Sequence, residues 1–242
     1  MDIRTGLVIM GTICLIYIYD STYLLYRNEA IVIAKFRNRF AIKLGSPSYT
    51  LFGRCVYIPN PLFAHRPIYR ILWDAGNTGA SLGSSCINEI GKFKLLKLAP
   101  CMWLMLFASF VLLPIGFYVS HGLYLVIGVV VYFYLTIILL IVFLAIDKKI
   151  LGINTIHFIG ICFESLVCAP CALNIIKKSA SANRVRADLI QLSRGLLSPS
   201  NLADFYHEFL TNIDAQLMVE QEGSSRYERL KTYRQTVMSQ IA

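Results

Sequence analysis

The segment from Leu123 to Ile146, LYLVIGVVVYFYLTIILLIVFLAI, decides the fold class of this chain. It contains no charged residue, and it exceeds the roughly 20 residues that a helix needs to cross a hydrocarbon layer about 30 Å thick. Two other segments, Gly6 to Tyr26 and Ala99 to Val119, are similarly long and apolar. We therefore predict an integral membrane α-helical protein with three transmembrane helices. We expect the lipid bilayer to be one of its partners.

The composition supports this class. Of the 242 residues, 56% are hydrophobic and only 15% are charged, whereas soluble domains carry roughly 25% charged residues. Such a chain is neither intrinsically disordered nor a secreted disulfide scaffold. Its seven cysteines are absent from the predicted outer connection between the second and third spans, which fits a reducing compartment without structural disulfides.

The distribution of basic residues predicts the orientation. Eleven Lys and Arg residues lie between positions 27 and 97 and eleven more follow position 147, whereas the connection 120–122 has none. Because Lys and Arg accumulate on the cytoplasmic side, we predict a multi-pass protein of a bacterial-type inner (plasma) membrane, with the N-terminus outside and the C-terminus cytoplasmic. The first span lacks the basic start and the cleavage site of a signal peptide, so we interpret it as a retained anchor.

A fourth apolar segment, Ile150 to Ile176, is ambiguous. It is long enough to cross the membrane, but it contains Glu164 and Pro170, and a crossing would carry the basic residues that follow it to the outside. Burying an acidic side chain near mid-bilayer costs about 2 to 3 kcal/mol on insertion scales. We favour an interfacial or re-entrant helix, with a fourth span as the alternative.

The remaining segments predict two small cytoplasmic modules. Ala30–Phe36 and Phe40–Leu44 have the β-branched content and period-two alternation of a hairpin, and Cys55–Ile58 and Ile68–Trp73 add two strands. The predicted order is an N-terminal transmembrane anchor (1–26), a β module (27–74), a flexible tether (75–98), a transmembrane helical hairpin (99–146), an interfacial or re-entrant segment (147–178) and a C-terminal cytoplasmic helical tail (179–242).

The helical tail carries an apolar stripe on one face. Its members recur at three and four residues: Leu202, Phe205, Tyr206, Phe209, Leu210, Ile213 and Leu217. Such a stripe is more often a packed core than an interface. We expect these helices to pack on one another, with docking of another protein or of a second copy as the alternative.

Residues with chemical potential gather in the fourth segment. Cys168 and Cys171 form a CxxC motif, and His157 and Cys162 precede it. Such a pair can hold zinc or perform thiol redox chemistry, but a thioredoxin-like context and a second cysteine pair are missing. The alternative is that these cysteines are small apolar residues of a membrane-embedded helix that Pro170 kinks.

Two acidic residues in apolar surroundings, Asp20 and Glu164, are the other candidates. With His157 they could form a proton or ion path, because charges persist in apolar segments mainly where a partner or a function retains them. Asp20 lies near the inner end of the first span, where snorkelling also explains it. Three spans without an internal repeat argue against a transporter.

The sequence assigns no catalytic residue and no cofactor-binding motif. We expect a non-enzymatic membrane-embedded scaffold or docking subunit that presents the β module and the amphipathic tail to cytoplasmic partners. Nucleic acid is not expected, since basic and aromatic residues are not interleaved as a stacking platform requires. The competing hypothesis is a membrane enzyme, or a metal or thiol-redox protein with zinc as its cofactor. It would use the residues of the fourth segment at the inner interface: Cys162, Cys168, Cys171, His157 and Glu164.

Overall fold

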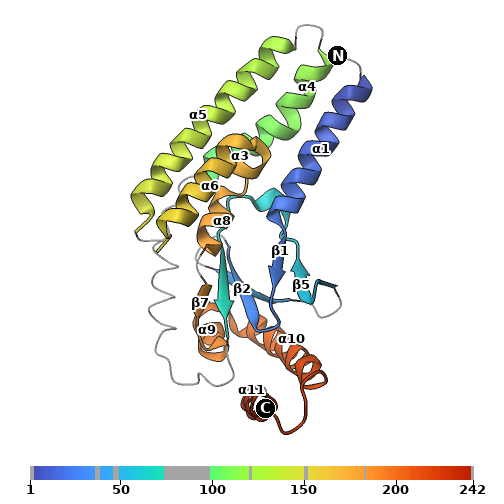
Figure 1. Ribbon diagram of the computed structural model, residues 1–242, viewed down its shortest axis with the longest axis vertical. Helices are drawn as coiled ribbons and strands as arrows, with labels where there is room; N and C mark the ends of the chain where they lie inside the picture. Colours follow the sequence, from blue (N-terminus) through green and yellow to red (C-terminus); the bar gives the residue numbers. More distant parts are fainter. Residues whose placement is uncertain are drawn as a thin grey trace. The chain divides into compact units, whose positions relative to one another are not determined.

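The computed structural model describes residues 3–35, 39–45, 49–73, 99–119, 122–149, 152–182 and 184–240 (Figure 1). It is mostly helical with a small β module, as the sequence predicts. The predicted tether (75–98), with Cys86, and the outer connection at 120–121 lie outside the described residues. The described residues form two compact units. The helical unit draws on Met1–Thr22, Ile58–Pro67 and Phe93–Ala182, and the mixed unit on Tyr23–Tyr57, Ile68–Lys92 and Asn183–Ala242.

The helical unit contains two helices that are long and apolar enough to cross a membrane, Ala99–Tyr118 and Leu123–Ile146. The first comprises α3 (Ala99–Phe107), a π-helical turn η3 (Ala108–Leu112) and α4 (Leu113–Tyr118), and the second lies within α5 (Leu123–Asp147). The π-helical turn ends two residues before Pro114. The proline ring has no N–H and clashes with the carbonyl four residues earlier, so the backbone widens there.

The N-terminal helix α1 (Ile3–Ser21) is shorter than the segment predicted from the sequence. It ends at Ser21, where the hydroxyls of Ser21 and Thr22 both donate to the Ile18 carbonyl oxygen at 2.9 Å. Residues Tyr23–Leu25 form a strand instead of continuing the helix. The prediction that the apolar anchor is helical to Tyr26 is therefore wrong by about one turn. The helix ends early because Tyr23–Leu25 pairs with β5 (Arg54–Tyr57).

The fourth apolar segment folds as a broken helical hairpin. Helix α6 (Thr155–Val167) is followed by the short α7 (Ala169–Ala172) and by α8 (Ile175–Ser181). The break falls at Cys168, two residues before Pro170, as expected for a proline that cannot continue the hydrogen-bond ladder. Helix α6 lies beside α5, and α8 follows next to α6 (Figure 1). The short α7 contacts α1. A short 3-10 helix, η1 (Pro61–Phe63), also belongs to this unit.

The mixed unit contains two sheets rather than one. A four-stranded sheet has the order β3 (Phe40–Leu44), β2 (Glu29–Ala34), β6 (Ile68–Leu72) and β7 (Arg184–Arg186). A three-stranded sheet has the order β1 (Tyr23–Leu25), β5 (Arg54–Tyr57) and β4 (Thr50–Leu51). All four predicted strands form, and the predicted hairpin pairs Ala34 with Phe40. The parallel pairing of β6 with β7 recruits a strand from the segment predicted as purely helical.

Three helices complete the mixed unit: α9 (Leu189–Leu196), α10 (Pro199–Leu217) and α11 (Ser225–Met238). The apolar stripe of α10 is core. Phe205, Phe209 and Ile213 are all buried, and the Phe209 ring lies edge-on to Trp73 with ring centroids 5.0 Å apart. Burial of each such side chain contributes roughly 1.5 to 3 kcal/mol. The strands and the C-terminal helices thus share one core.

Candidate functional site

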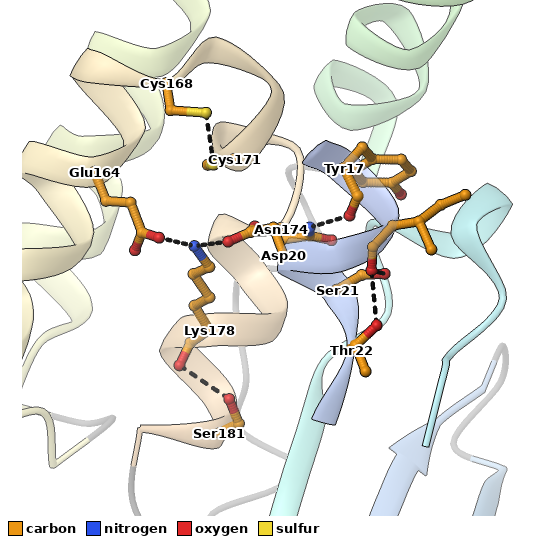
Figure 2. Close-up of polar contacts among 11 residues, drawn as sticks. Tyr17, Asp20, Ser21, Thr22, Glu164, Cys168, Cys171, Asn174, Lys178 and Ser181 are labelled. Carbon is orange, nitrogen blue, oxygen red and sulfur yellow. Dashed lines mark hydrogen bonds and ion pairs between the residues drawn. The ribbon is translucent and has the colours of Figure 1, made fainter. Parts of the chain in front are cut away.

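A polar cluster in the helical unit joins α1 to α6 and α8, two helices that lie far from α1 in the sequence (Figure 2). Lys178 on α8 places its Nζ 2.5 Å from Asp20 Oδ1, near the end of α1, and 2.8 Å from Glu164 Oε1 on α6. Because the chain breaks between α6 and α8, α8 runs back beside α6 and brings Lys178 close to Glu164. Both acidic residues suspected from the sequence therefore contact the same lysine.

A neighbouring amide completes the cluster. Asn174, at the start of α8, donates from Nδ2 to Asp20 Oδ2 at 2.9 Å and to the Tyr17 carbonyl oxygen at 3.3 Å. Asn174 and Lys178 are separated by one helical turn, so both reach the end of α1 from the same face of α8. The contacts tie α1 to the broken hairpin.

The two ion pairs differ in burial. The side chains of Asp20 and Lys178 are 9% and 18% exposed, whereas that of Glu164 is 49% exposed. Removing one partner of a buried pair leaves an uncompensated charge, but a solvent-exposed pair contributes little. Burial lowers the pKa of Lys178, yet its hydrogen bonds and proximity to Asp20 and Glu164 raise that pKa above the ordinary value. Lys178 is thus a stable cation, and its contact with Asp20 is the stronger of the two.

The CxxC motif lies beside this cluster. The Sγ atoms of Cys168 and Cys171 are 2.7 Å apart, with the Cys171 thiol donating. Cys171 is buried, and burial, its hydrogen bond to Cys168 and the nearby Asp20 charge all raise its pKa. A reactive or metal-binding cysteine needs the opposite shift, since the thiolate is the nucleophile and the ligand. Cys171 is therefore held as a thiol.

The structure brings together only part of the predicted site. Asp20, Glu164 and Cys171 have candidate ligand atoms within 4.8 Å of one another, and no group of this kind among the described residues includes His157 or Cys162. His157 is exposed on α6 and Cys162 is half-buried. The Lys178 ammonium already pairs with both carboxylates of this group, so a metal ion would have to displace it.

Sequence reasoning missed the two residues that complete the cluster, Asn174 and Lys178. Asn174 was visible only as a polar residue in an apolar segment, and Lys178 only as part of the basic block that sets orientation. The sequence signal that could have identified them is their spacing of four residues, which places them on one helix face, shortly after Pro170.

A second lysine in α8 has a different environment. The side chain of Lys177 is 1% exposed, and its Nζ has no hydrogen-bond partner among the described residues. It lies 5.8 Å from the centroid of the Tyr17 ring. Burial lowers the pKa of Lys177 to about 8, although the Asp20 charge opposes the shift. A buried amine of this kind costs stability while it is protonated.

The mixed unit has a buried charge network of its own. Glu29 on β2 pairs with Arg70 on β6 at 2.6 Å and with Arg184 on β7 at 3.0 Å. Its carboxylate also accepts from the Tyr26 backbone N–H at 2.9 Å. One carboxylate therefore links three strands, including the parallel strand β7.

Comparison of the chain with protein-family models, with curated proteins and with solved structures finds no match. Residues 79–83 read Gly-Ala-Ser-Leu-Gly, the Gly-x-Ser-x-Gly pattern that hydrolases place on a strand-to-helix turn. The segment lies outside the described residues and carries no proposal.

Proposed function

We propose that the chain is a non-enzymatic integral protein of a bacterial-type inner membrane, in which three spans hold a docking unit at the cytoplasmic face. The observation that carries the proposal is the surface of the two long apolar helices. Only 33% of each hydrophobic window is buried, and large side chains such as Leu135, Ile138 and Phe143 are exposed. A core helix of a soluble protein would be mostly buried, whereas lipid would cover these side chains.

Helix α1 is the third span of this proposal. Its 19 residues extend about 28 Å, close to the thickness of the hydrocarbon layer. It lies beside α4, and its N-terminus is at the end of the unit where α4 leads into α5 (Figure 1). This arrangement supports the proposal of an outer N-terminus, with Asp20 at the inner interface. Helix α6, with 13 residues, extends only about 20 Å, which supports a re-entrant segment.

The mixed unit is the docking body. Because it has its own core, it presents a defined surface. Its docking contacts cannot involve Phe205 or Phe209, which are buried. Exposed apolar side chains remain at the turn between β4 and β5 and after α10, where Phe52 is 90% and Met218 is 86% exposed. We propose that a protein partner, or a second copy of the chain, contacts the unit at these positions.

Photo-crosslinking in intact membranes tests this proposal. A photoreactive amino acid replaces Phe52 or Met218, and Arg194, which is exposed but polar, serves as the matched control position. The proposal expects one discrete adduct from position 52 or 218 and none from position 194. An adduct of twice the chain mass assigns the contact to self-association. If positions 52 and 218 give no adduct, the docking proposal fails.

The second candidate function is a thiol or zinc protein at the inner interface. The close approach of the Cys168 and Cys171 Sγ atoms favours it. Stoichiometric zinc in the purified protein would support it, as would loss of function in the Cys168→Ser/Cys171→Ser variant with unchanged abundance. Zinc-free protein whose function survives the double substitution would leave the scaffold proposal in place.

A further inference from the structure

The mixed unit contains a basic cavity of about 410 Å³. Its walls come from the turn between β1 and β2, from the turn between β4 and β5, and from α10 and α11. Three of the residues that line it are arginines, Arg27, Arg226 and Arg229, and none is acidic. The volume lies in the range of small-molecule sites, roughly 300 to 1,000 Å³. A cavity of this charge attracts anions.

The positive charge of the cavity is largely uncompensated. Arg226 pairs with Glu220 at 2.9 Å. Within the described part of the chain, Arg27 and Arg229 form no ion pair, and Arg229 Nε donates only to the Ser225 carbonyl oxygen of its own helix at 3.2 Å. Two guanidinium groups therefore remain available to an anionic ligand.

Two buried polar atoms of the lining residues also lack partners among the described residues. Trp73 is 1% exposed, and its Nε1 has no acceptor. Gln216 is 3% exposed; its Nε2 donates to the Arg27 carbonyl oxygen at 2.9 Å and to Asn212 Oδ1 at 2.8 Å, but its Oε1 has no donor. Buried polar atoms without partners are rare and costly. Trp73 and Gln216 both line the cavity, and each has one polar atom without a partner among the described residues.

The Trp73 ring and the Gln216 amide are held in place by their surroundings. The Trp73 ring stacks on Tyr233 with centroids 6.0 Å apart, and the Trp73 backbone N–H donates to the Asn28 carbonyl oxygen at 3.0 Å. The hydrogen bonds of Gln216 fix its amide. A ligand would meet a preorganised site, which lowers the entropic cost of binding.

We propose that this cavity binds a phosphate monoester that also carries a hydroxyl group. Guanidinium groups bind phosphate through paired N–H···O bonds, so Arg27 and Arg229 hold the phosphate. A phosphate oxygen accepts from Trp73 Nε1, and the hydroxyl group donates to Gln216 Oε1. The same chemistry occurs in soluble hydroxylated phosphate monoesters and in the headgroup of lysophosphatidic acid, which carries a phosphate monoester and a free hydroxyl. All of these residues belong to the mixed unit, so the inference is independent of the number of spans.

Tryptophan fluorescence reports binding directly. The chain has two tryptophans, so the full-length Trp103→Phe variant leaves Trp73 as the only emitter. The purified protein in nonionic detergent is titrated with glycerol 3-phosphate and, as a control without phosphate, with glycerol. In a second arm, the protein in nanodiscs of phosphatidylcholine alone is compared with the protein in nanodiscs of phosphatidylcholine that contain lysophosphatidic acid. We expect a saturable change in Trp73 emission with at least one phosphate monoester and none with glycerol or phosphatidylcholine.

Charge-matched variants separate the site from general attraction. Arg27→Gln/Arg229→Gln should raise the Kd at least tenfold. The control Arg186→Gln/Arg194→Gln removes the same charge from exposed arginines outside the cavity and should change the Kd less than twofold. The emission maximum of unliganded Trp73 verifies that each variant is folded.

Each outcome decides the proposal or the source of the ligand. Saturation with glycerol 3-phosphate alone assigns a soluble ligand, and saturation with lysophosphatidic acid alone assigns a lipid headgroup. Saturation with both supports the chemistry that the two ligands share. The proposal is overturned if neither probe saturates, if glycerol acts as well as its phosphate, or if the control variant loses as much affinity as the cavity variant.

Discussion

Replacing Glu29 with glutamine should destabilise the mixed unit by about 3 kcal/mol. The Glu29 side chain is fully buried, and its two partners, Arg70 and Arg184, are 17% and 47% exposed. Breaking a buried ion pair costs about 3 to 5 kcal/mol because a charge stays behind without a partner. The amide oxygen of glutamine can still accept from the Tyr26 N–H, so we expect the lower end of this range.

The matched control is Arg184→Gln, which removes the more exposed partner and leaves Glu29 paired with Arg70. Arg184 is 47% exposed and Glu29 keeps its Arg70 partner, so this variant should lose less stability than Glu29→Gln. The difference in unfolding free energy between the two variants measures the contribution of the buried Glu29 charge.

The assay is urea unfolding followed by Trp73 fluorescence in the Trp103→Phe background, because Trp73 lies in the core of the mixed unit. With a slope of about 2 kcal/mol per molar urea, Glu29→Gln should lower the midpoint by about 1.5 M. The reasoning is refuted if Glu29→Gln lowers the midpoint no more than Arg184→Gln does.

Three further predictions test the core, the helical hairpin and the buried amine. Phe209→Ala should destabilise the mixed unit by about 3 to 5 kcal/mol, measured in the same urea assay, whereas Met218→Ala at an exposed position should change little. Gly122→Ala should lower the thermal stability of the purified protein, because a Cβ there would lie 1.8 Å from a carbonyl oxygen of α4; Gly128→Ala, with open space around its Cβ, should not. Lys177 has a folded pKa of about 8 against an ordinary value of 10.5, so the unfolded chain binds more protons between these values and stability should rise with pH across that window. Thermal melts of the Lys177→Met variant should show a smaller rise over the same window and higher stability at pH 7; an equal rise in both proteins would contradict this.

The local features of the fold were predictable from the sequence. The alternation at Phe40–Leu44 and the β-branched residues before it predicted the β2–β3 hairpin, and the proline at position 170 predicted the break before α7. Each of these depends on neighbouring residues only.

The long-range features were not predictable. Strand β7 pairs with β6, which lies more than 100 positions away in the sequence. No local pattern in Arg184–Arg186 predicts this pairing. The same limit applies to the site. Asp20 and Glu164 were conspicuous as acids in apolar segments, but their shared partner Lys178 is defined by how three helices pack. The Trp73 cavity likewise depends on α10 and α11 closing over the strands.

Membrane topology tests the central claim most directly. Compartment-sensitive reporters are fused after Asp74, after Val119 and after Ala242 in separate full-length or truncated fusions. The account predicts that the reporters after Asp74 and Ala242 report the cytoplasm and that the reporter after Val119 reports the outside. Opposite compartments for the fusions at Asp74 and Ala242 would contradict the account.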